Sequence, residues 1–213
     1  MKSFLLAVLI TSACLSGCLF SENKEDQYQS IDDEIDVDEF SVHCLEHDNL
    51  ERCWLLLVPA ILNESTNIPL LVDIHGGGDD MYQQRWTSDF ANLSIEQGFI
   101  VAYPQGHDNL WNQAEGVIPG ANEEDVGFII KMIDEIKNNY TIDHSRIYVT
   151  GWSNGCGMAH RLAVQASDVF AAAGCMSMYQ FANVDTEYSP IPFMEVHGLL
   201  DEAVHYGLSL IHI

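Results

Sequence analysis

The sequence predicts an α/β domain with a mostly parallel β-sheet and helices on both faces of that sheet. Short apolar runs rich in β-branched residues alternate with longer stretches of helical periodicity. Several of these runs are followed at once by glycine or proline, as is usual where a buried strand ends. With 213 residues, of which 47% are hydrophobic and 19% are charged, the chain can bury a core of this kind.

The expected elements follow one another in the order that a parallel sheet requires. The expected strands are residues 52–58, 69–75, 99–104, 146–153, 169–177 and 191–198. The expected helices are residues 81–97, 123–140 and 154–167. Gly98 is expected to end the first helix and Asn122 to cap the second, while residues 105–122 form a long loop.

The amino terminus has the features of an export signal. Lys2 precedes an apolar stretch, 4–15, which is too short to span a membrane comfortably. The following "LSGC" ends at Cys18 and is typical of the site at which a lipoprotein signal peptide is removed. We therefore expect residues 1–17 to be a signal peptide and Cys18 to carry the lipid. An ordinary signal peptide or an uncleaved anchor with an incidental cysteine is the alternative.

Acidic residues dominate the charge of the chain and are partly concentrated near its start. Residues 21–40 hold nine acids and one lysine, so residues 18–42 are expected to form a flexible tether. The net charge of the whole chain is −24. Such a surface repels phosphates, which argues against DNA or RNA as a partner.

The cysteines agree with an exported protein. Four remain after the signal region, and an even number in an exported chain favours disulfides. Cys44 and Cys53 flank a turn-like segment and could close a hairpin. Three pairings are possible, and we favour Cys44–Cys53 with Cys156–Cys175, the alternative for the second pair being buried free thiols.

The segment "GWSNG", 151–155, fits the pattern G-x-S-x-G between an expected strand and an expected helix. This turn projects a serine hydroxyl from the edge of a sheet, and its glycines make room for the close approach of strand and helix. The amino end of the helix favours negative charge near the serine. We therefore expect Ser153 to be a nucleophile, against the alternative of a surface turn with an incidental serine.

A glycine-rich turn follows the second expected strand. Residues 75–78, "HGGG", would expose backbone N–H groups to an oxyanion, and we favour Gly77 together with Asn154 as the donors. The competing interpretation is a phosphate-binding loop. The turn has neither the lysine nor the glycine spacing of such a loop.

An acid and a base should accompany the serine. Asp201 lies just past the last expected strand and suits the acid that orients a histidine, with Asp185 as the other candidate. The base should follow the acid, but His205 is too close to Asp201 and His212 is the penultimate residue. His75, His160 and His197 are expected to be structural: neutral, hydrogen-bonded and local.

Several motifs in order resemble the polyhydroxybutyrate depolymerase-like and feruloyl esterase-like group of the α/β-hydrolases. These are "HGGG", "AYPQG…WN", "EEDVGFI", "DHSRIYVTGWSNGCGMAHRLA", "DVFAAAGCMS" and "VHGLLDEAVHYG". The resemblance covers about residues 50–207 and implies an α/β-hydrolase fold with Ser153 as nucleophile and Asp201 as acid. It also implies a carboxyl-terminal segment with the histidine, which is missing from this chain.

The last six residues do not fit this pattern. Residues 208–213, "LSLIHI", match the in-frame translation of a widely used transposon sequencing adapter. We therefore expect residues 43–207 to be a partial α/β-hydrolase domain and residues 208–213 to be adapter. The alternative is a short apolar strand that ends the natural chain.

Together these expectations describe an exported, lipid-anchored serine esterase. Its substrate would be a polyhydroxyalkanoate, a feruloylated or acetylated polysaccharide or a small ester, hydrolysed without cofactor or metal through an acyl-enzyme. Trp111 and Trp152 either line a subsite or belong to the core. A serine peptidase of the same fold and a non-catalytic binding lipoprotein remain open, and the 213-residue chain itself is expected to be nearly inactive.

Overall fold

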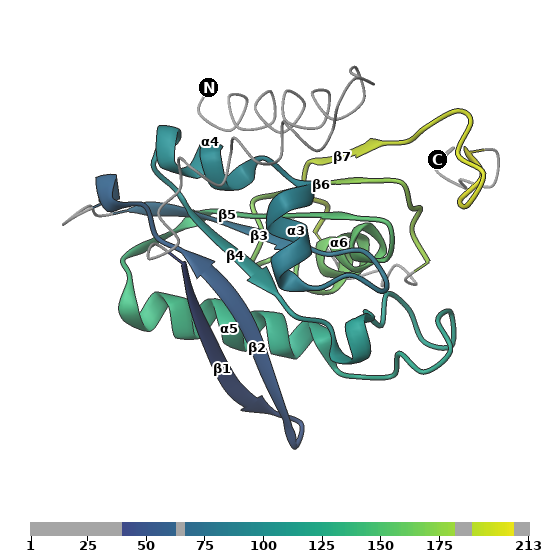
Figure 1. Cartoon of the computed structure of the whole chain (residues 1–213), viewed down its shortest axis with the longest axis horizontal. Coiled ribbons are helices and arrows are strands. Elements are labelled where there is room, and N and C mark those ends of the chain that lie inside the picture. The colour runs from purple at the N-terminus through teal and green to yellow at the C-terminus, as the bar shows by residue number, and fades with distance from the viewer. Residues whose placement is uncertain (1–39, 63–66, 182–188, 207–213) are drawn as a thin grey trace.

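The computed structural model describes residues 40–62, 67–181 and 189–206 (Figure 1). Its sheet has seven strands in the order β1-β2-β4-β3-β5-β6-β7. The strands are β1 Phe40–His47, β2 Leu50–Leu57, β3 Ile68–Ile74, β4 Ile100–Pro104, β5 Ile142–Trp152, β6 Ala172–Met176 and β7 Phe193–Val196. The pairs that involve β2 are antiparallel, and all the others are parallel.

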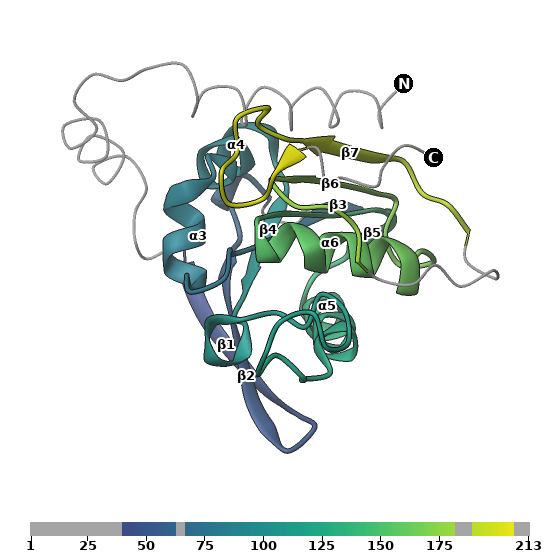
Figure 2. The same cartoon turned by 90° about the vertical axis from the view of Figure 1, so that its right-hand side faces the viewer.

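Helices cover both faces of this sheet (Figure 2). They are α3 Met81–Thr87, α4 Phe90–Gln97, α5 Asp125–Asn139 and α6 Asn154–Gln165, with short 3₁₀ turns at Ala60–Leu62 and His107–Asn109. Helices α5 and α6 lie on one face, and α3 and α4 lie on the other. The α/β prediction with a mostly parallel sheet is therefore confirmed.

Successive side chains of the central strands point to opposite faces of the sheet and so contribute to two separate hydrophobic cores. In β3, Leu70 and Val72 pack in the larger core with α5 and α6, while Leu71 packs in the smaller core with α3 and α4. Residues of β4 alternate in the same way, with Ala102 in the larger core and Tyr103 in the smaller one. A strand that is buried on both faces reads as a continuous apolar run, which is why these strands could be recognised in the sequence.

The amino-terminal hairpin was only partly expected. Strand β1 was not predicted, and it begins at Phe40, inside the range assigned to the acidic tether. Asp48 and Asn49 connect it to β2, both with positive φ, as a two-residue hairpin turn requires. Cys44 and Cys53 face each other across the two strands and form a disulfide, so this predicted pairing is confirmed.

One expected helix is interrupted, and another begins two residues later than expected. The helix expected over residues 81–97 is broken into α3 and α4 at Ser88, whose backbone is extended and whose hydroxyl donates a 2.5 Å hydrogen bond to the buried carboxylate of Asp73. The second helix is capped by Glu124 instead of Asn122: the Glu124 side chain accepts a hydrogen bond from the backbone N–H of Gly127. Helix α4 ends before Gly98, as predicted.

The expected signal peptide, the acylated Cys18, most of the tether, Asp185 and residues 208–213 lie outside the described residues. Within 40–62, 67–181 and 189–206, no helix is both long and apolar enough to cross a membrane.

Candidate active site

The parallel strands place the predicted site residues along one edge of the sheet. His75 follows β3, Ser153 follows β5, and His197 follows β7. Strands that run parallel end at the same edge, which is where ligands bind in open α/β sheets. The topology therefore brings together segments that are far apart in the sequence.

Ser153 occupies a strained turn between β5 and α6. Its φ of 52° and ψ of −121° lie in a region that residues with a side chain rarely adopt, at a cost of roughly 1–3 kcal/mol. The backbone N–H of Ser153 donates a 2.9 Å hydrogen bond to the carbonyl of Met176 at the end of β6. The turn is thus anchored to the neighbouring strand while the serine stands at the amino end of α6.

The glycines on either side of Ser153 make this turn possible. A Cβ atom on Gly151 would lie 2.5 Å from the carbonyl oxygen of Gly155. A Cβ atom on Gly155 would collide with the carbonyl oxygens of Ile74 and His75. The spacing in G-x-S-x-G therefore has a steric cause in this chain: both positions lie against main-chain atoms.

Gly77 and Asn154 are brought together as expected. A Cβ atom on Gly77 would lie 3.3 Å from Cβ of Asn154, so the glycine-rich loop touches the first residue of α6. The Asn154 side chain makes two hydrogen bonds to the backbone of Trp111: it accepts from the N–H at 2.8 Å and donates to the carbonyl at 3.0 Å. The N–H groups of the first helical turn have no acceptor within the helix and remain available to an oxyanion.

His75 supports the glycine-rich loop. Its Nδ1 donates to the carbonyl of Gly76 at 2.7 Å, and its Nε2 accepts from the N–H of Gly106 at 2.9 Å. Burial lowers the pKa of His75, which favours the neutral imidazole that this pair of hydrogen bonds requires. Both ring nitrogens are occupied, so His75 has the structural role expected of it.

Asp201 caps the turn that follows β7. Its Oδ1 accepts hydrogen bonds from the N–H groups of Ala203 and Val204, each at 2.9 Å. The Val204 hydrogen bond is the main reason why the pKa of Asp201 is lowered. Its Oδ2 lies 3.6 Å from Nε2 of His197. Asp201 therefore stands on the same edge of the sheet as Ser153, in contact with a histidine that sequence reasoning assigned to a structural role.

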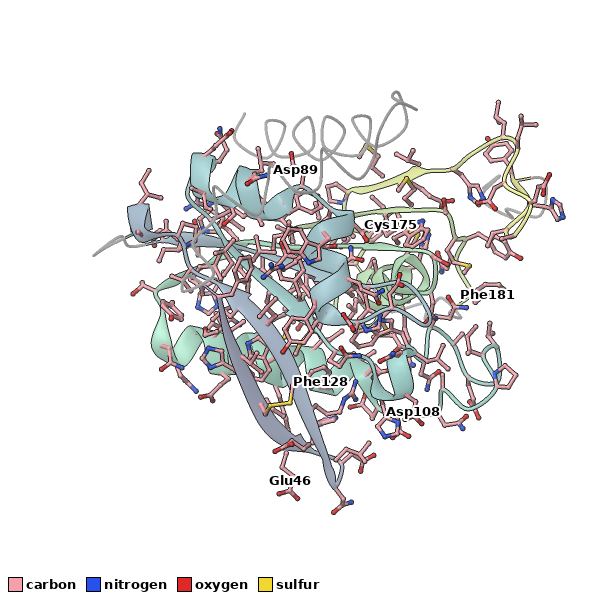
Figure 3. The ribbon with its side chains drawn as sticks, viewed as in Figure 1. Glu46, Asp89, Asp108, Phe128, Cys175 and Phe181 are labelled. Atoms are coloured by element: carbon pink, nitrogen blue, oxygen red, sulfur yellow. A yellow bond between two sulfur atoms is a disulfide. The ribbon has the colours of Figure 1, made fainter. Side chains whose placement is uncertain are left out.

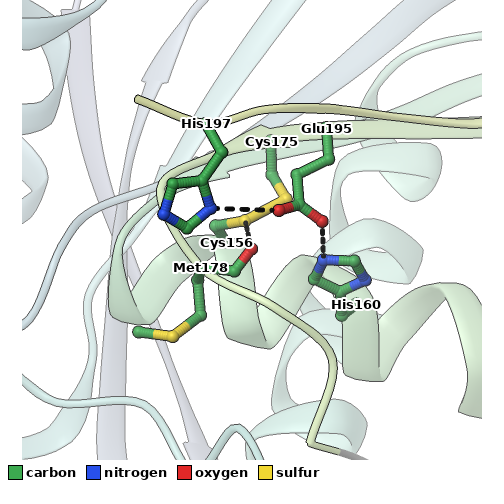
Figure 4. The surroundings of a disulfide bond; sticks show 6 residues. All are labelled: Cys156, His160, Cys175, Met178, Glu195 and His197. Atoms are coloured by element: carbon green, nitrogen blue, oxygen red, sulfur yellow. Dashed lines mark hydrogen bonds and ion pairs between the residues drawn. A yellow bond between two sulfur atoms is a disulfide. The ribbon is translucent and has the colours of Figure 1, made fainter. Parts of the chain in front are cut away.

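Glu195 was missed by the sequence analysis. Its carboxylate lies between two imidazoles, with Oε2 3.2 Å from Nε2 of His160 and Oε1 3.3 Å from Nδ1 of His197 (Figure 4). Nε2 of His197 also donates to the carbonyl of Val204 at 2.7 Å. An acid inside the short apolar run 191–196 was the only sequence signal for this bridge.

The second predicted disulfide is also present. Cys156 and Cys175 are bonded, which joins the first turn of α6 to β6 beside the Glu195 bridge (Figure 4). Cys156 is three residues from Ser153, so the disulfide ties the helix that begins after Ser153 to the strand whose Met176 carbonyl accepts from the Ser153 N–H.

The two tryptophans near the site differ in exposure. Trp111 is 0% exposed and donates its indole N–H to the carbonyl of His75 at 3.1 Å, so it belongs to the core. Trp152 is 37% exposed, and a Cβ atom on Gly76 would lie 3.1 Å from its ring. Trp152, beside Ser153 and the glycine-rich loop, is therefore the tryptophan that a substrate could reach.

Comparisons with known proteins agree on one family. The family model described as "Esterase PHB depolymerase" matches residues 52–205. A bifunctional acetylxylan esterase/xylanase from Neocallimastix patriciarum is 31% identical over 148 residues, which are 68% of this chain and 21% of that protein. Feruloyl esterase B from Piromyces equi is 32% identical over 150 residues, which are 66% of this chain and 28% of that protein. The chain thus spans less than a third of either relative.

Solved structures show the same fold. The crystal structure of a thermostable esterase superposes with a TM-score of 0.67 at 24% identity and covers 80% of this chain and 49% of its own. An acetyl xylan esterase from Aspergillus awamori superposes with a TM-score of 0.61 at 22% identity and covers 78% and 75%, respectively. At these identities the superpositions establish the fold.

Proposed function

Because the chain belongs to the Esterase PHB depolymerase family, we propose that it is the catalytic region of a serine esterase that hydrolyses carboxylic esters. The observation that carries this proposal is the turn at Ser153. A serine held at positive φ, at the amino end of α6 and against the loop of Gly77, supports a role in attack on a carbonyl. The glycine-rich loop and the helix amino terminus are placed to receive the charge that develops.

In the proposed mechanism Ser153 loses its proton to a histidine and attacks the ester carbonyl. The N–H groups of Gly77 and Asn154 stabilise the resulting oxyanion, the alcohol leaves, and water hydrolyses the acyl-enzyme. Asp201 is the acid that orients the histidine. That histidine is proposed to lie in the complete protein outside the described residues, since His75, His160 and His197 are held by hydrogen bonds of their own.

Feruloylated or acetylated polysaccharides are the substrates that the names of the similar proteins suggest, with polyhydroxyalkanoates and small esters as further candidates. The partly exposed ring of Trp152 beside the nucleophile suits an aromatic or otherwise flat acyl group. A peptidase activity of the same site, or binding without catalysis, is the competing proposal.

The decisive experiment compares Ser153→Ala with Ser145→Ala in the complete protein that the locus encodes. Ser145 lies at the opposite end of β5 and hydrogen-bonds to Asp143, so its loss leaves the edge that holds Ser153 untouched. We expect fluorophosphonate labelling and p-nitrophenyl butyrate hydrolysis to disappear only in Ser153→Ala. Labelling without ester turnover, but with cleavage of peptide substrates, would establish the peptidase. No labelling of the wild-type protein would favour a binding protein.

Export and anchoring are a separate proposal. Two disulfides favour an oxidising compartment outside the cytoplasm, and Cys18 is proposed as the site of lipid attachment, followed by a tether over residues 18–42. Incorporation of radiolabelled palmitate should be lost in Cys18→Ser. Sequencing of the source locus through codon 207 tests whether the frame continues in place of residues 208–213.

A further inference from the structure

Side chains of the types that bind metal ions gather around the Cys156–Cys175 disulfide. Cys156, Cys175 and His160 each offer a ligand atom, and these atoms lie within 4.8 Å of one another. All three residues are buried, and Glu195 adds a carboxylate beside His160 (Figure 4). Thiolate, imidazole and carboxylate are the ligands that zinc prefers in proteins.

The four side chains come from two matched pairs. Cys156 and His160 are four residues apart on α6, which places them on one face of the helix. Cys175 and Glu195 are direct partners in the register of β6 and β7, which places them on one face of the sheet. Since α6 packs on β6, the helical pair faces the strand pair. The arrangement follows from the periodicity of both elements and does not depend on a loop.

We propose that, when this disulfide is reduced, Cys156, His160, Cys175 and Glu195 bind one zinc ion or a similar thiophilic divalent cation. The proposal is independent of the esterase activity. A thiol reductant donates two electrons and two protons to the Sγ–Sγ bond. The reductant is oxidised to its own disulfide, and the protein is left with two thiols. The cation then replaces the two thiol protons, which are released to solvent.

The dimensions fit this exchange. Ligand atoms around a tetrahedral zinc ion lie roughly 3.3–3.8 Å apart, as follows from bond lengths of about 2.0–2.3 Å. Nε2 of His160 and Oε2 of Glu195 are already 3.2 Å apart. The two sulfur atoms must move apart to bind the ion. The Cα atoms of Cys156 and Cys175 are 4.9 Å apart and belong to a helix and a strand, which can shift slightly relative to each other.

The surroundings support the site in two further ways. Nδ1 of His197 contacts Oε1 of Glu195, so the carboxylate is oriented by a second imidazole, as metal ligands usually are. The residues of β7 are all partly exposed, and β7 is an outer strand of the sheet within the described residues, so a cation can enter past this strand. In the reduced protein the ion would replace the disulfide as the link between α6 and β6.

The test measures zinc binding by competition with a chromophoric chelator, with and without a phosphine reductant. Cys44→Ser/Cys53→Ser is the matched control, because it removes the other disulfide, whose cysteines lie near Glu51. We expect one tight equivalent of zinc in the reduced wild type and in this control. The oxidised wild type and reduced Cys156→Ser/Cys175→Ser should lack that equivalent.

Variants that keep both cysteines guard against a loss of folding. His160→Gln and Glu195→Gln in the reduced protein should each weaken zinc binding tenfold or more while the circular dichroism spectrum stays unchanged. Cobalt should give sulfur-to-metal charge-transfer absorption that only the Cys156 and Cys175 thiols support. The proposal is overturned if the reduced control binds no zinc, if Cys156→Ser/Cys175→Ser keeps the tight equivalent, or if both glutamine variants bind as the wild type does.

Discussion

Asp73 is a fully buried acid that has no part in the proposed chemistry. It lies in β3, where Gln84 donates to its Oδ1 at 2.7 Å and Ser88 to its Oδ2 at 2.5 Å. No cation contacts it among the described residues. Burial therefore outweighs the two hydrogen bonds and raises its pKa from 3.8 to about 7.

This raised pKa predicts how stability depends on pH. The folded protein keeps the Asp73 proton up to about pH 7, whereas the unfolded chain loses it near pH 3.8. The folded state binds more protons in this window, so the Asp73 contribution to the free energy of unfolding is complete below pH 4 and is lost as the pH rises to 7. Across this window the Asp73 contribution to the free energy of unfolding is expected to fall by something on the order of 4 kcal/mol.

Asp73→Asn should remove this dependence, because an amide can accept from Gln84 and donate to the Ser88 hydroxyl without ionising. The measurement is urea unfolding of both proteins between pH 4 and pH 8. We expect the difference in unfolding free energy between variant and wild type to change in favour of the variant as the pH rises. Asp134→Asn, at an exposed position of α5, is the control. Parallel pH profiles for wild type and Asp73→Asn would show that the interpretation is wrong.

Gly155→Ala tests the steric origin of the serine turn. Alanine normally stabilises a helix by about 0.5–1 kcal/mol relative to glycine. Here the added Cβ would meet the carbonyls of Ile74 and His75, which belong to the backbone and cannot rotate away. We expect a net loss of about 2–3 kcal/mol in chemical denaturation and a drop in esterase activity of the complete protein.

Gly127→Ala on α5 is the matched comparison for this substitution. The nearest atoms to its Cβ belong to the Glu124 side chain, which can move aside at the cost of its helix cap and its contact with His47, together about 1–2 kcal/mol. Equal losses for the two alanine variants would contradict a backbone clash at Gly155.

At the scale of elements, one buried ion pair fastens the long loop and α5 to the hairpin. Arg52 of β2 lies 2.7 Å from Oδ1 of Asp125, and its guanidinium stacks 4.1 Å above the ring of Phe128, which projects from α5 toward β2 (Figure 3). Oδ2 of Asp125 accepts from the N–H of Asn112 in the loop that carries Trp111. Three elements thus meet at a pair that is 2% and 1% exposed.

Asp125→Ala should leave the Arg52 charge buried and unpaired. We expect the free energy of unfolding to fall by about 3–5 kcal/mol, measured by urea denaturation. Asp134→Ala, which breaks the exposed pair with Lys137, should cost less than about 1 kcal/mol. A small effect of Asp125→Ala would mean that water reaches Arg52.

Elements that are set by local pattern could be predicted from the sequence, whereas those that are set by distant partners could not. The central strands and the turn at Ser153 follow from apolar runs and from glycine spacing. The break between α3 and α4 depends on Asp73, which is 15 residues away from Ser88. The cap of α5 is Glu124, whose carboxylate also contacts His47 of β1, and β1 depends on pairing with β2, because half of its residues face solvent.

The candidate site divides in the same way. That Gly77 lies against Asn154, beside Ser153, could be predicted because the glycine-rich loop and the serine turn are both recognisable in the sequence. Glu195 could not be assigned, since its two imidazole partners come from α6 and from the residue after β7. The side-chain contacts of His197 became visible only when the strands were placed in register.

At the scale of the whole molecule, the charge is the dominant feature. The chain has 32 acidic residues against 8 lysines and arginines, so the compact state repels itself more strongly than the expanded one. Raising the NaCl concentration from 10 mM to 0.5 M shortens the screening length from about 30 Å to less than 8 Å. We expect the melting temperature to rise by a few degrees, measured by calorimetry.

Sucrose at equal osmolality separates screening from preferential exclusion. If screening causes the rise in melting temperature, choline chloride should raise it as much as NaCl does. Sucrose should not reproduce the rise that occurs at low salt concentration, where the screening length changes most. A melting temperature that does not depend on salt would show that the acids are too far apart to interact.

The main-chain atoms packed around Ser153 also affect how far the sequence of such a protein can diverge. The atoms that lie against the turn are the carbonyls of Ile74, His75 and Gly155, and the carbonyl of Met176 accepts from its N–H group; every amino acid supplies the same carbonyl. Mutations in the surrounding side chains are therefore expected to leave the backbone of Ser153 where it is, provided that the two glycines persist. If the proposed esterase activity holds, the side chains around this turn can change during evolution, and the accepted ester with them, while the backbone of the turn stays the same.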